Sequence, residues 1–581
     1  MSYNILAVNP GHNASVALVC DGELVYHIEE ERLTRNKWDG NPLRAIVEVI
    51  SKWRVDELIL GGTQYEYVLL PWTSQDPFYS LVRKYYPDVI LTKMGHEHHF
   101  GHAATAFYNS GFENCVTVVI DGAGTRRKEE FSPGEFFEGW ETESIWMCGY
   151  PHNINLLFRA YGHNERSGKI YTGLFDFDNA ISITKAYEGV TEYLGFHPIE
   201  SGKTMGLSSY GKYDDSIPDF FINGRGNNNL FIPNFPSSSI IDLNRYPHLQ
   251  SGNGDTTKGN GFRSGREWHK KNPDCITDIE KNMAWRVQND TQELVAELIQ
   301  KAIDLSGQNN VCISGGYGLN CVTNYFLAKK FPYVNFYFEP NCNDAGTSVG
   351  LANYFWHYRS GDKTIRKQNS LYLGPEYDKD EILAILMDGV YEGKIDTETV
   401  TYKDVARLIA DRNIVAMFQG RSESGPRALG NRSILYDPTD PKGKDYVNTV
   451  KGREWFRPFA GTVLQEHASE WFDLAGREES QFMMMAVDVL PEKTHIIPAI
   501  THVDNTCRVQ TLKIEQNEHY YNLINEFYKI TNVPMLFNTS FNLAGDPIVE
   551  TIDNALDSLY RSKLNYLYLP ELELLITKKE I

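Results

Sequence analysis

Three apolar runs, each followed by a polar or glycine-rich turn, constrain the fold of this chain more than any other feature. They are "NILAV" at 4–8, "CVTVVIDGAG" at 115–124 and "NVCISGGYGLN" at 310–320. A buried strand followed by a glycine turn and a helix N-terminus presents backbone N–H groups that bind anions or nucleotides. A tight strand-to-helix turn explains any one of these runs, but three of them together favour ligand binding.

The first run continues as a strand meander. "ASVALVC" at 14–20 has the pattern of a second strand, and Asp21-Gly22 is a strong hairpin signal before "ELVYHIEEER". The order of strand, polar loop, strand, tight turn and strand resembles the start of actin-like and sugar-kinase-type ATPase domains. It predicts an α/β, ribonuclease H-like fold for the N-terminal part.

Size and composition indicate a multidomain globular protein. With 581 residues the chain favours two to four domains, and its composition is 41% hydrophobic and 23% charged. No apolar run is long enough to span a bilayer, and the first residues lack the basic region and cleavage site of a signal peptide, so we expect a cytoplasmic protein without membrane contact. The eight cysteines form no C-x-x-C motif, which argues against a disulfide framework.

The formal net charge of −20 repels polyanions. It weighs against a nucleic-acid binder, so a tRNA partner is not expected, and it implies that a phosphate-bearing ligand would meet a local cluster of basic residues. A homodimer is expected on frequency alone.

A polar, basic stretch at 359–377 marks a domain boundary. It predicts an N-terminal domain at 1–365, with a loop insertion at about 213–270 that is rich in Asn, Gly, Ser and Pro, and a second α/β domain at 370–581. Apolar residues at helical spacing between 276 and 305 predict one core helix or a pair of helices.

Four of the sixteen histidines lie in "GHEHHFGH" at 95–102. In a helix His98 and His102 would share one face, one turn apart, while His96 and His99 would point elsewhere. A capped turn is the simpler interpretation of an isolated H-x-x-x-H pattern.

Two aspartates strengthen the interpretation of the histidine pair as a metal site. Asp121 ends the second apolar run, and Asp344 precedes small residues in "PNCNDAGTSVG". Two imidazoles and two carboxylates suit iron(II), zinc or manganese better than calcium.

A dense basic constellation lies in the C-terminal part. The blocks "QGRSESGPRALGNRSILYDP" at 419–438 and "VKGREWFRPFAG" at 450–461 contain Arg421, Arg427, Arg432, Lys451, Arg453 and Arg457. Guanidinium forks match phosphate oxygens two at a time, so the cluster predicts a phosphate site, with an arginine-rich solvated face as the alternative. Arg508 in "DNTCRVQTL", and Asn538 and Ser540 in "LFNTSFN", offer further polar groups at strand ends.

The order of these blocks resembles the O-carbamoyltransferase family of antibiotic tailoring and nodulation-factor decoration. The blocks that carry the resemblance are "GHNASVALVCDGELVYHIEEERLTRNKWDG", "HHFGHAATAF", "VIDGAG", "SGKTMGLSSYGK", "SGGYGLNCVTN", "CNDAG", "QGRSESGPRALGNRSILYDP", "KGREWFRPFA", "DNTCRVQTL" and "LFNTSFNLAGDPIVET". The resemblance covers nearly the whole chain outside 213–270. It implies an actin-like metal domain followed by a YrdC-like domain.

The family resemblance also implies two reactions. The YrdC-like domain would convert carbamoyl phosphate and ATP, with magnesium, into carbamoyl adenylate, and the actin-like domain would transfer the carbamoyl group to a hydroxyl. By motif, the phosphate-bearing substrates would be held by Arg427, Arg432, Lys451, Arg453, Arg457, Arg508, Asn538 and Ser540. Iron(II) would be bound by His98, His102, Asp121 and Asp344.

The remaining implied residues belong to the transfer step. Gly315 and Gly316, together with Lys203, would receive the adenylate, and His12 would be the general base on the acceptor hydroxyl. Asn13 stands where the family usually has aspartate, which leaves open what assists His12. Tyr317 and Gly318 replace a common Val-Ala pair.

Three other functions agree less well with the sequence. A threonylcarbamoyl-type tRNA modification enzyme is the main alternative. A sugar kinase or chaperone-like ATPase would not use the histidine pair or the arginine cluster. A non-catalytic binding module would not need two polar sites. The sequence does not identify the acceptor, which we expect to be a small-molecule or nucleotide-like hydroxyl.

Overall fold

The computed structural model describes residues 2–61, 77–95, 97–165, 171–177, 180–250, 276–387, 391 and 393–579. The chain forms two compact units, Met1–Val25 with Gly40–Gln368, and Tyr26–Asp39 with Asn369–Ile581. The main division lies inside the predicted linker. The predicted N-terminal domain of 1–365, however, includes Tyr26–Asp39, which belongs to the C-terminal unit because it hydrogen-bonds to that unit's loops.

The first sheet of the N-terminal unit has the strand order β3-β2-β1-β4-β5. Its strands are β1 (Asn4–Asn9), β2 (Ser15–Cys20), β3 (Glu23–Glu29), β4 (Glu57–Gly61) and β5 (Ile90–Met94). β1 pairs antiparallel with β2 and parallel with β4. Asp21 and Gly22 both have positive φ, as the predicted tight hairpin requires, so the meander inferred from the sequence is confirmed.

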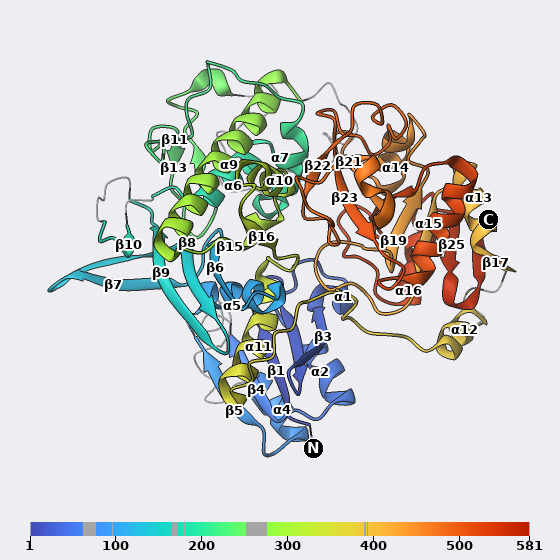
Figure 1. Cartoon of the computed structure of the whole chain (residues 1–581), viewed down its shortest axis with the longest axis horizontal. Helices are drawn as coiled ribbons and strands as arrows, with labels where there is room; N and C mark the ends of the chain where they lie inside the picture. The colour runs from blue at the N-terminus through green and yellow to red at the C-terminus, as the bar shows by residue number, and fades with distance from the viewer. Residues whose placement is uncertain are drawn as a thin grey trace. The chain divides into compact units, whose positions relative to one another are not determined.

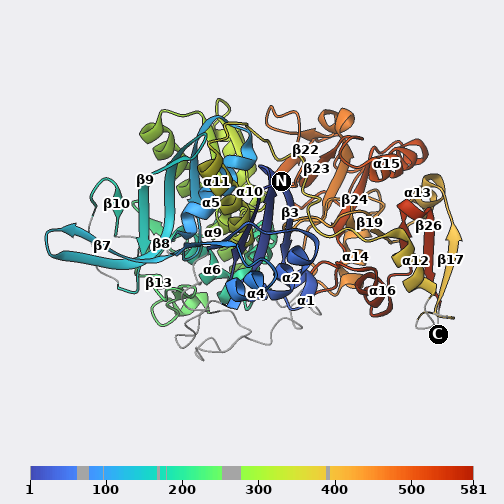
Figure 2. The same ribbon diagram turned by 90° about the horizontal axis from the view of Figure 1, so that it is seen from below.

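The second sheet has the order β10-β9-β8-β6-β15-β16, with β7 paired to β8. Its strands are β6 (Asn114–Ile120), β7 (Arg126–Ser132), β8 (Glu135–Gly149), β9 (Asn153–Gly162), β10 (Phe175–Asp176), β15 (Asn310–Ser314) and β16 (Asn335–Phe338). β15 lies between β6 and β16 and is parallel to both. The ribbon of β7 and β8 extends beyond the helices of its unit (Figures 1 and 2).

Helices flank both sheets. They are α2 (Leu43–Lys52), α4 (Pro77–Tyr85), α5 (His98–Ser110), α6 (Ile183–Tyr193), α7 (Ser201–Ser208), α9 (Asp278–Ser306), α10 (Cys321–Lys330) and α11 (Thr347–Ser360). The run at 276–305 is thus one long helix, and Glu280 accepts a hydrogen bond from the Thr277 amide at its start.

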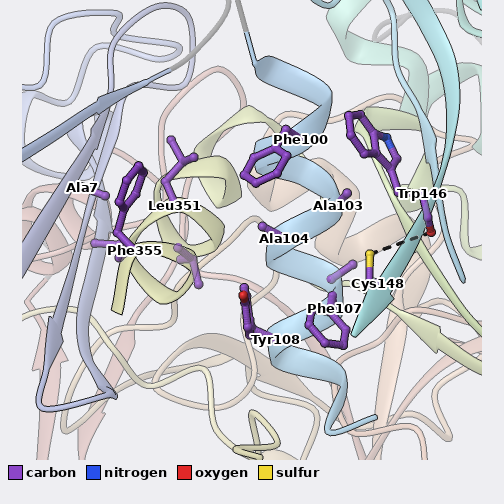
Figure 3. Close-up of a cluster of buried hydrophobic side chains, with 14 of the residues drawn as sticks. Ala7, Phe100, Ala103, Ala104, Phe107, Tyr108, Trp146, Cys148, Leu351 and Phe355 are labelled. Atoms are coloured by element: carbon purple, nitrogen blue, oxygen red, sulfur yellow. Dashed lines mark hydrogen bonds between the residues drawn. The ribbon is translucent and has the colours of Figure 1, made fainter. Parts of the chain in front are cut away.

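Helix α5 is the centre of the core of this unit. Every residue from His98 to Ser110 is buried, so α5 is apolar or paired on all sides, as a helix enclosed by other elements must be. Figure 3 shows it between Leu351 and Phe355 of α11 and Trp146 and Cys148 of β8. A rigid, fully enclosed helix gives its histidines a fixed position.

The predicted insertion contains little regular structure. Over 213–250 it has two short strand pairs, β11 (Phe221–Ile222) with β12 (Arg225–Gly226) and β13 (Phe231–Ile232) with β14 (Ile240–Ile241). Its remainder, 251–270, lies outside the described residues.

The C-terminal unit is built on a ten-stranded sheet of order β17-β26-β25-β18-β19-β24-β20-β23-β22-β21. The strands are β17 (Ile395–Thr399), β18 (Val415–Phe418), β19 (Arg432–Tyr436), β20 (Ala460–Leu464), β21 (Phe472–Asp473), β22 (Ala486–Val489), β23 (Thr506–Leu512), β24 (Met535–Ser540), β25 (Tyr566–Leu569) and β26 (Leu574–Lys578). The helices are α1 (Glu30–Thr34), α12 (Lys379–Met387), α13 (Tyr402–Ala410), α14 (Gly443–Lys451), α15 (Glu518–Thr531) and α16 (Ile552–Tyr560).

Both units therefore confirm the predicted α/β class, with mixed sheets and helices that cover them. Within the described ranges no helix has the length and apolar character needed to cross a bilayer.

Candidate functional site

Four predicted metal ligands meet at the N-terminal end of α5. His98 and His102 come from the helix, Asp121 follows β6, and Asp344 opens a short 3-10 turn (Asp344–Gly346). Their donor atoms all lie within 4.8 Å of one another. His98 Nε2 is 3.1 Å from His102 Nε2 and 3.2 Å from Asp121 Oδ2, and Asp344 Oδ1 is 3.4 Å from His98 Nε2.

The charges in this group depend on one another. Burial disfavours a charged imidazole, yet Asp344 and Asp121 raise the pKa of His98 to about 10. Burial and Asp344 act to raise the pKa of Asp121, but His98 and His102 hold it below its ordinary range. Two buried carboxylates thus require a positive charge between them, which a divalent cation supplies as well as a proton does.

The donor set fits a metal ion. Two imidazole nitrogens and two carboxylate oxygens converge, and the ligands have supporting contacts: Asp121 Oδ1 accepts a hydrogen bond from the Gly316 amide at 3.0 Å, and His102 Nδ1 lies 3.4 Å from Ser314 Oγ. Such outer contacts orient ligands in metal sites. The mixed N/O set suits iron(II), manganese or zinc.

The His99 side chain points away from these four ligands. Its Nδ1 lies 2.8 Å from Ser144 Oγ, and burial lowers its pKa to about 3. The spacing argument therefore chose the two histidines that the structure brings together. His96 lies outside the described residues.

The glycine turn after β15 lies against the same aspartate. Gly315 has φ 87°, and a Cβ there would lie 2.2 Å from the Ile120 carbonyl oxygen, so only glycine fits. The turn directs the Gly316 amide at Asp121. The predicted nucleotide turn and the predicted metal ligands are therefore neighbours, connected through one side chain.

Lys203 and Tyr317, which the sequence associates with this turn, are held by other elements. Lys203 on α7 is nearly buried and forms an ion pair of 3.0 Å with Glu200. The Tyr317 hydroxyl lies 2.8 Å from Thr291 Oγ1.

His12, in the loop after β1, is connected to the metal ligands by Asp344. Its Nε2 lies 3.1 Å from Asp344 Oδ2 and its Nδ1 lies 3.0 Å from Asn13 Oδ1. The Asp344 carboxylate raises the pKa of His12. Asn13 leaves His12 without an adjacent carboxylate in the sequence, and the structure supplies one from Asp344 instead.

The basic residues of the C-terminal unit form a crowded group. Burial lowers the pKa of the Lys451 ammonium well below its ordinary value, and the charges of Arg453 and Arg457 add to this effect. The pKa of Arg453 is lowered by burial and by Arg457 and Arg508. Lys451 is buried and the three arginines are half-buried. Like charges held this close destabilise one another, so this arrangement suits an anionic ligand.

The neighbouring strands β24, β20 and β23 bring Asn538 and Arg508 to the same level of the sheet. Ala460 of β20 is paired with Arg508 of β23 and with Asn538 of β24, so Arg508 and Asn538 project from the same face of the sheet. Two residues beyond Asn538, the carbonyl of Ser540 accepts a hydrogen bond from Lys451 Nζ. Asn538 itself is fully buried, and its Nδ2 donates to Thr462 Oγ1 at 3.0 Å.

Arg432 departs from the predicted arrangement. It is fully buried, its guanidinium donates to the carbonyls of Gln419 at 2.5 Å and Gly420 at 3.2 Å, and it lies over the Phe418 ring. Its donors are used by the protein backbone, so the structure favours a scaffolding role for Arg432 over a ligand contact. Arg427 lies half-buried on the loop that precedes it.

Two further residues were missed by the sequence analysis. Lys37 belongs to the C-terminal unit, and its charge contributes to the lowered pKa of Lys451; its position in the basic run "LTRNKWDG" was the available signal. Glu423 is buried, and its Oε1 accepts hydrogen bonds from the Leu429, Asn431 and Arg432 amides. These bonds fix the conformation of the loop 421–431. No pattern in the sequence distinguishes this glutamate.

Comparison with protein families gives two matches. The description "Carbamoyltransferase N-terminus" matches residues 55–353, and "Carbamoyltransferase C-terminus" matches residues 406–577. Together they match the larger part of each unit.

Individual proteins are similar over most of the chain. An uncharacterized protein of Synechocystis sp. is 30% identical, over 96% of this chain and 94% of its own length. Nodulation protein NolNO of Sinorhizobium fredii is 28% identical, over 95% of this chain and 77% of its own. Among solved structures, full-length HypF in its phosphate- and nucleotide-bound form has 13% identity and a TM-score of 0.33, over 62% of this chain and 56% of HypF.

Proposed function

Since the chain belongs to the carbamoyltransferase family and is thus a transferase, we propose that it is an ATP-dependent O-carbamoyltransferase that acts in two steps. The first step forms carbamoyl adenylate in the C-terminal unit, which we take to be YrdC-like. The second transfers the carbamoyl group to an acceptor hydroxyl in the N-terminal unit. The observation that supports the proposal is the group of cations around Lys451, in which the buried Lys451 lies among the half-buried Arg453, Arg457 and Arg508.

The first step consumes one water, one carbamoyl phosphate and one ATP. Water hydrolyses carbamoyl phosphate to carbamate and phosphate, and a carbamate oxygen then attacks the α-phosphorus of ATP, with release of pyrophosphate. Lys451, Arg453 and Arg508 bind the phosphate oxygens and offset the negative charge that develops during transfer. Arg457 and Ser540 border the same group, and magnesium accompanies ATP.

In the second step the acceptor hydroxyl attacks the carbamoyl carbon, and AMP leaves. His12 accepts the hydroxyl proton, and its contact with Asp344 fixes the ring. The adenylate would lie against the turn at Gly315 and Gly316, whose Gly316 amide is engaged by Asp121 and holds that carboxylate in place.

A metal ion in this unit would be held by His98, His102, Asp121 and Asp344, and iron(II) is the ion we propose. When bound it would act as a Lewis acid on the carbamoyl carbonyl. The acceptor is a small-molecule or nucleotide-like hydroxyl; the charge of −20 makes a tRNA acceptor unfavourable.

The proposal is tested with purified full-length protein, ATP, magnesium and labelled carbamoyl phosphate, without an acceptor. We expect release of pyrophosphate and formation of labelled carbamoyl adenylate. If a folded protein leaves carbamoyl phosphate untouched, the first step is wrong. In that case a threonylcarbamoyl-type reaction, with threonine and bicarbonate in place of carbamoyl phosphate, becomes the next assay.

A further inference from the structure

Residues Tyr26–Asp39, which we call the strap, are built into the C-terminal unit although they come from the start of the chain. The strap is fastened at its beginning by His27, whose amide donates to the Leu373 carbonyl at 3.1 Å and whose Nδ1 lies 2.5 Å from Ser424 Oγ. Beyond this point two arginines of the strap contact two separate loops.

Arg35 fixes the loop 540–549. Its two terminal nitrogens donate to the carbonyls of Ile548 at 2.6 Å and Pro547 at 2.8 Å. The planar fork of a guanidinium matches two successive carbonyls, whereas an ammonium is a compact charge without this fixed geometry. Arg35 has φ 62°, a conformation that glycine adopts at lower cost, so its contribution comes from the side chain.

The loop 540–549 in turn holds Lys451. The Asp546 carbonyl, next to Pro547, accepts a hydrogen bond from Asn542 Nδ2 at 2.7 Å. Asn542 Oδ1 accepts one from Lys451 Nζ at 3.1 Å, and the Ala544 amide donates to the Lys451 carbonyl at 3.0 Å. Arg35 is therefore connected to the ammonium of Lys451 by hydrogen bonds at Pro547 and at Asn542, which the peptide bond between Asp546 and Pro547 joins.

Arg32 makes the corresponding contact with the other loop. It is buried, and one of its nitrogens donates to the Gly425 carbonyl at 2.7 Å. Gly425 belongs to the loop 421–431, which carries Arg427. The strap thus contacts the loop that carries Arg427 and the loop that holds Lys451.

We propose that Arg35 is a positioning residue for the carbamoyl phosphate and ATP site: by fixing the loop 540–549 it sets the position of the Lys451 ammonium. The identity of the ligand rests on the proposed function. The strap is then part of the site, and the C-terminal unit cannot be separated from residues 26–39 without loss of affinity for its anionic substrate.

The experiment compares Arg35→Ala and Arg35→Lys with Arg412→Ala in the full-length protein. Arg412 is a matched control, because it also has a left-handed backbone (φ 66°) in the same unit and its side chain is 60% exposed. The readouts are KM for carbamoyl phosphate and kcat of pyrophosphate release, the thermal unfolding midpoint, and rescue by low-millimolar guanidinium.

We expect Arg35→Ala to raise KM for carbamoyl phosphate about tenfold or more, equivalent to ~1.4 kcal/mol, with an unfolding midpoint close to that of Arg412→Ala. Added guanidinium should lower this KM in Arg35→Ala and leave Arg412→Ala unchanged. Arg35→Lys should lie between Arg35→Ala and the unsubstituted protein, because a compact ammonium lacks the planar fork that matches two successive carbonyls.

An unchanged KM overturns the inference, and so does a loss of stability without guanidinium rescue, which would indicate a purely structural arginine. If the unsubstituted protein releases no pyrophosphate, the proposed function fails, and calorimetric titration with inorganic pyrophosphate decides the inference alone. Weaker binding by Arg35→Ala than by Arg412→Ala supports it; equal binding, or no binding by the unsubstituted protein, overturns it.

Discussion

At the scale of single residues, Asp344 connects two chemical roles. One carboxylate oxygen faces His98 and His102, and the other faces His12. A group that binds the proposed metal ion and also orients the proposed base would keep the reacting hydroxyl and the carbamoyl carbonyl in a fixed relation. The sequence distance between His12 and Asp344 explains why no local pattern predicted this contact.

A second buried carboxylate, Glu339, predicts a pH effect on stability. Burial raises its pKa from 4.5 to about 7, against the hydrogen bonds from the Asn341 amide and Asn109. Between these two values the folded protein binds more protons than the unfolded chain. The contribution of Glu339 to the free energy of unfolding is therefore complete below pH 4.5 and is lost as the pH rises to about 7. At ~1.4 kcal/mol for each pH unit, the loss amounts to about 3 kcal/mol.

We expect Glu339→Gln to remove this pH dependence. Denaturant unfolding of metal-free protein at about pH 5 and about pH 8 measures it, since the contributions of other groups cancel between variant and parent. Equal pH dependence in both proteins would show that Glu339 is ionised in the folded state at neutral pH.

At the scale of elements, the strand-to-helix turn at Gly315 predicts a difference between two glycines. Gly315 and Gly307 both have positive φ, but a Cβ at Gly315 meets the Ile120 carbonyl, whereas a Cβ at Gly307 meets nothing within 4 Å. An alanine pays ~1–2 kcal/mol for the left-handed backbone at either position. At Gly315 the carbonyl must also move, and this carbonyl belongs to the residue before Asp121.

Gly315→Ala should therefore lower the free energy of unfolding by more than Gly307→Ala, and it should also lower metal content. Denaturant titration and metal analysis of the two variants test this. The same loss of stability in both, with full metal content, would mean that the turn at Gly315 yields without disturbing Asp121.

Elements with a strong local pattern were predictable, and elements that depend on distant contacts were not. The meander of β1 to β3 follows from alternation and the Asp21-Gly22 signal, and the histidine pair of α5 follows from helical spacing. No local pattern predicts the strap, because its contacts are with loops some 400 to 500 residues further along the chain. Arg432 resembles the other arginines in sequence, and only its carbonyl partners reveal its burial.

At the scale of the whole molecule, two separate groups of residues predict two separable reactions. Arg508→Ala should reduce pyrophosphate release with carbamoyl phosphate by at least about 100-fold, since an arginine that stabilises transition-state charge contributes on this order, while metal content stays complete. His98→Ala should retain pyrophosphate release and lose the metal, because it removes one of the four donor groups of the proposed site.

The control for the histidine is His99→Gln, which changes the neighbouring imidazole that contacts Ser144 instead of the ligand group and should keep the metal. Metal analysis and pyrophosphate release, measured on the same preparations, separate the cases. Full metal occupancy in His98→Ala would contradict the ligand set, and full pyrophosphate release in Arg508→Ala would remove this arginine from the first step. Loss of both properties in either variant would mean that the two reactions depend on each other, because neither substitution touches the residues of the other group.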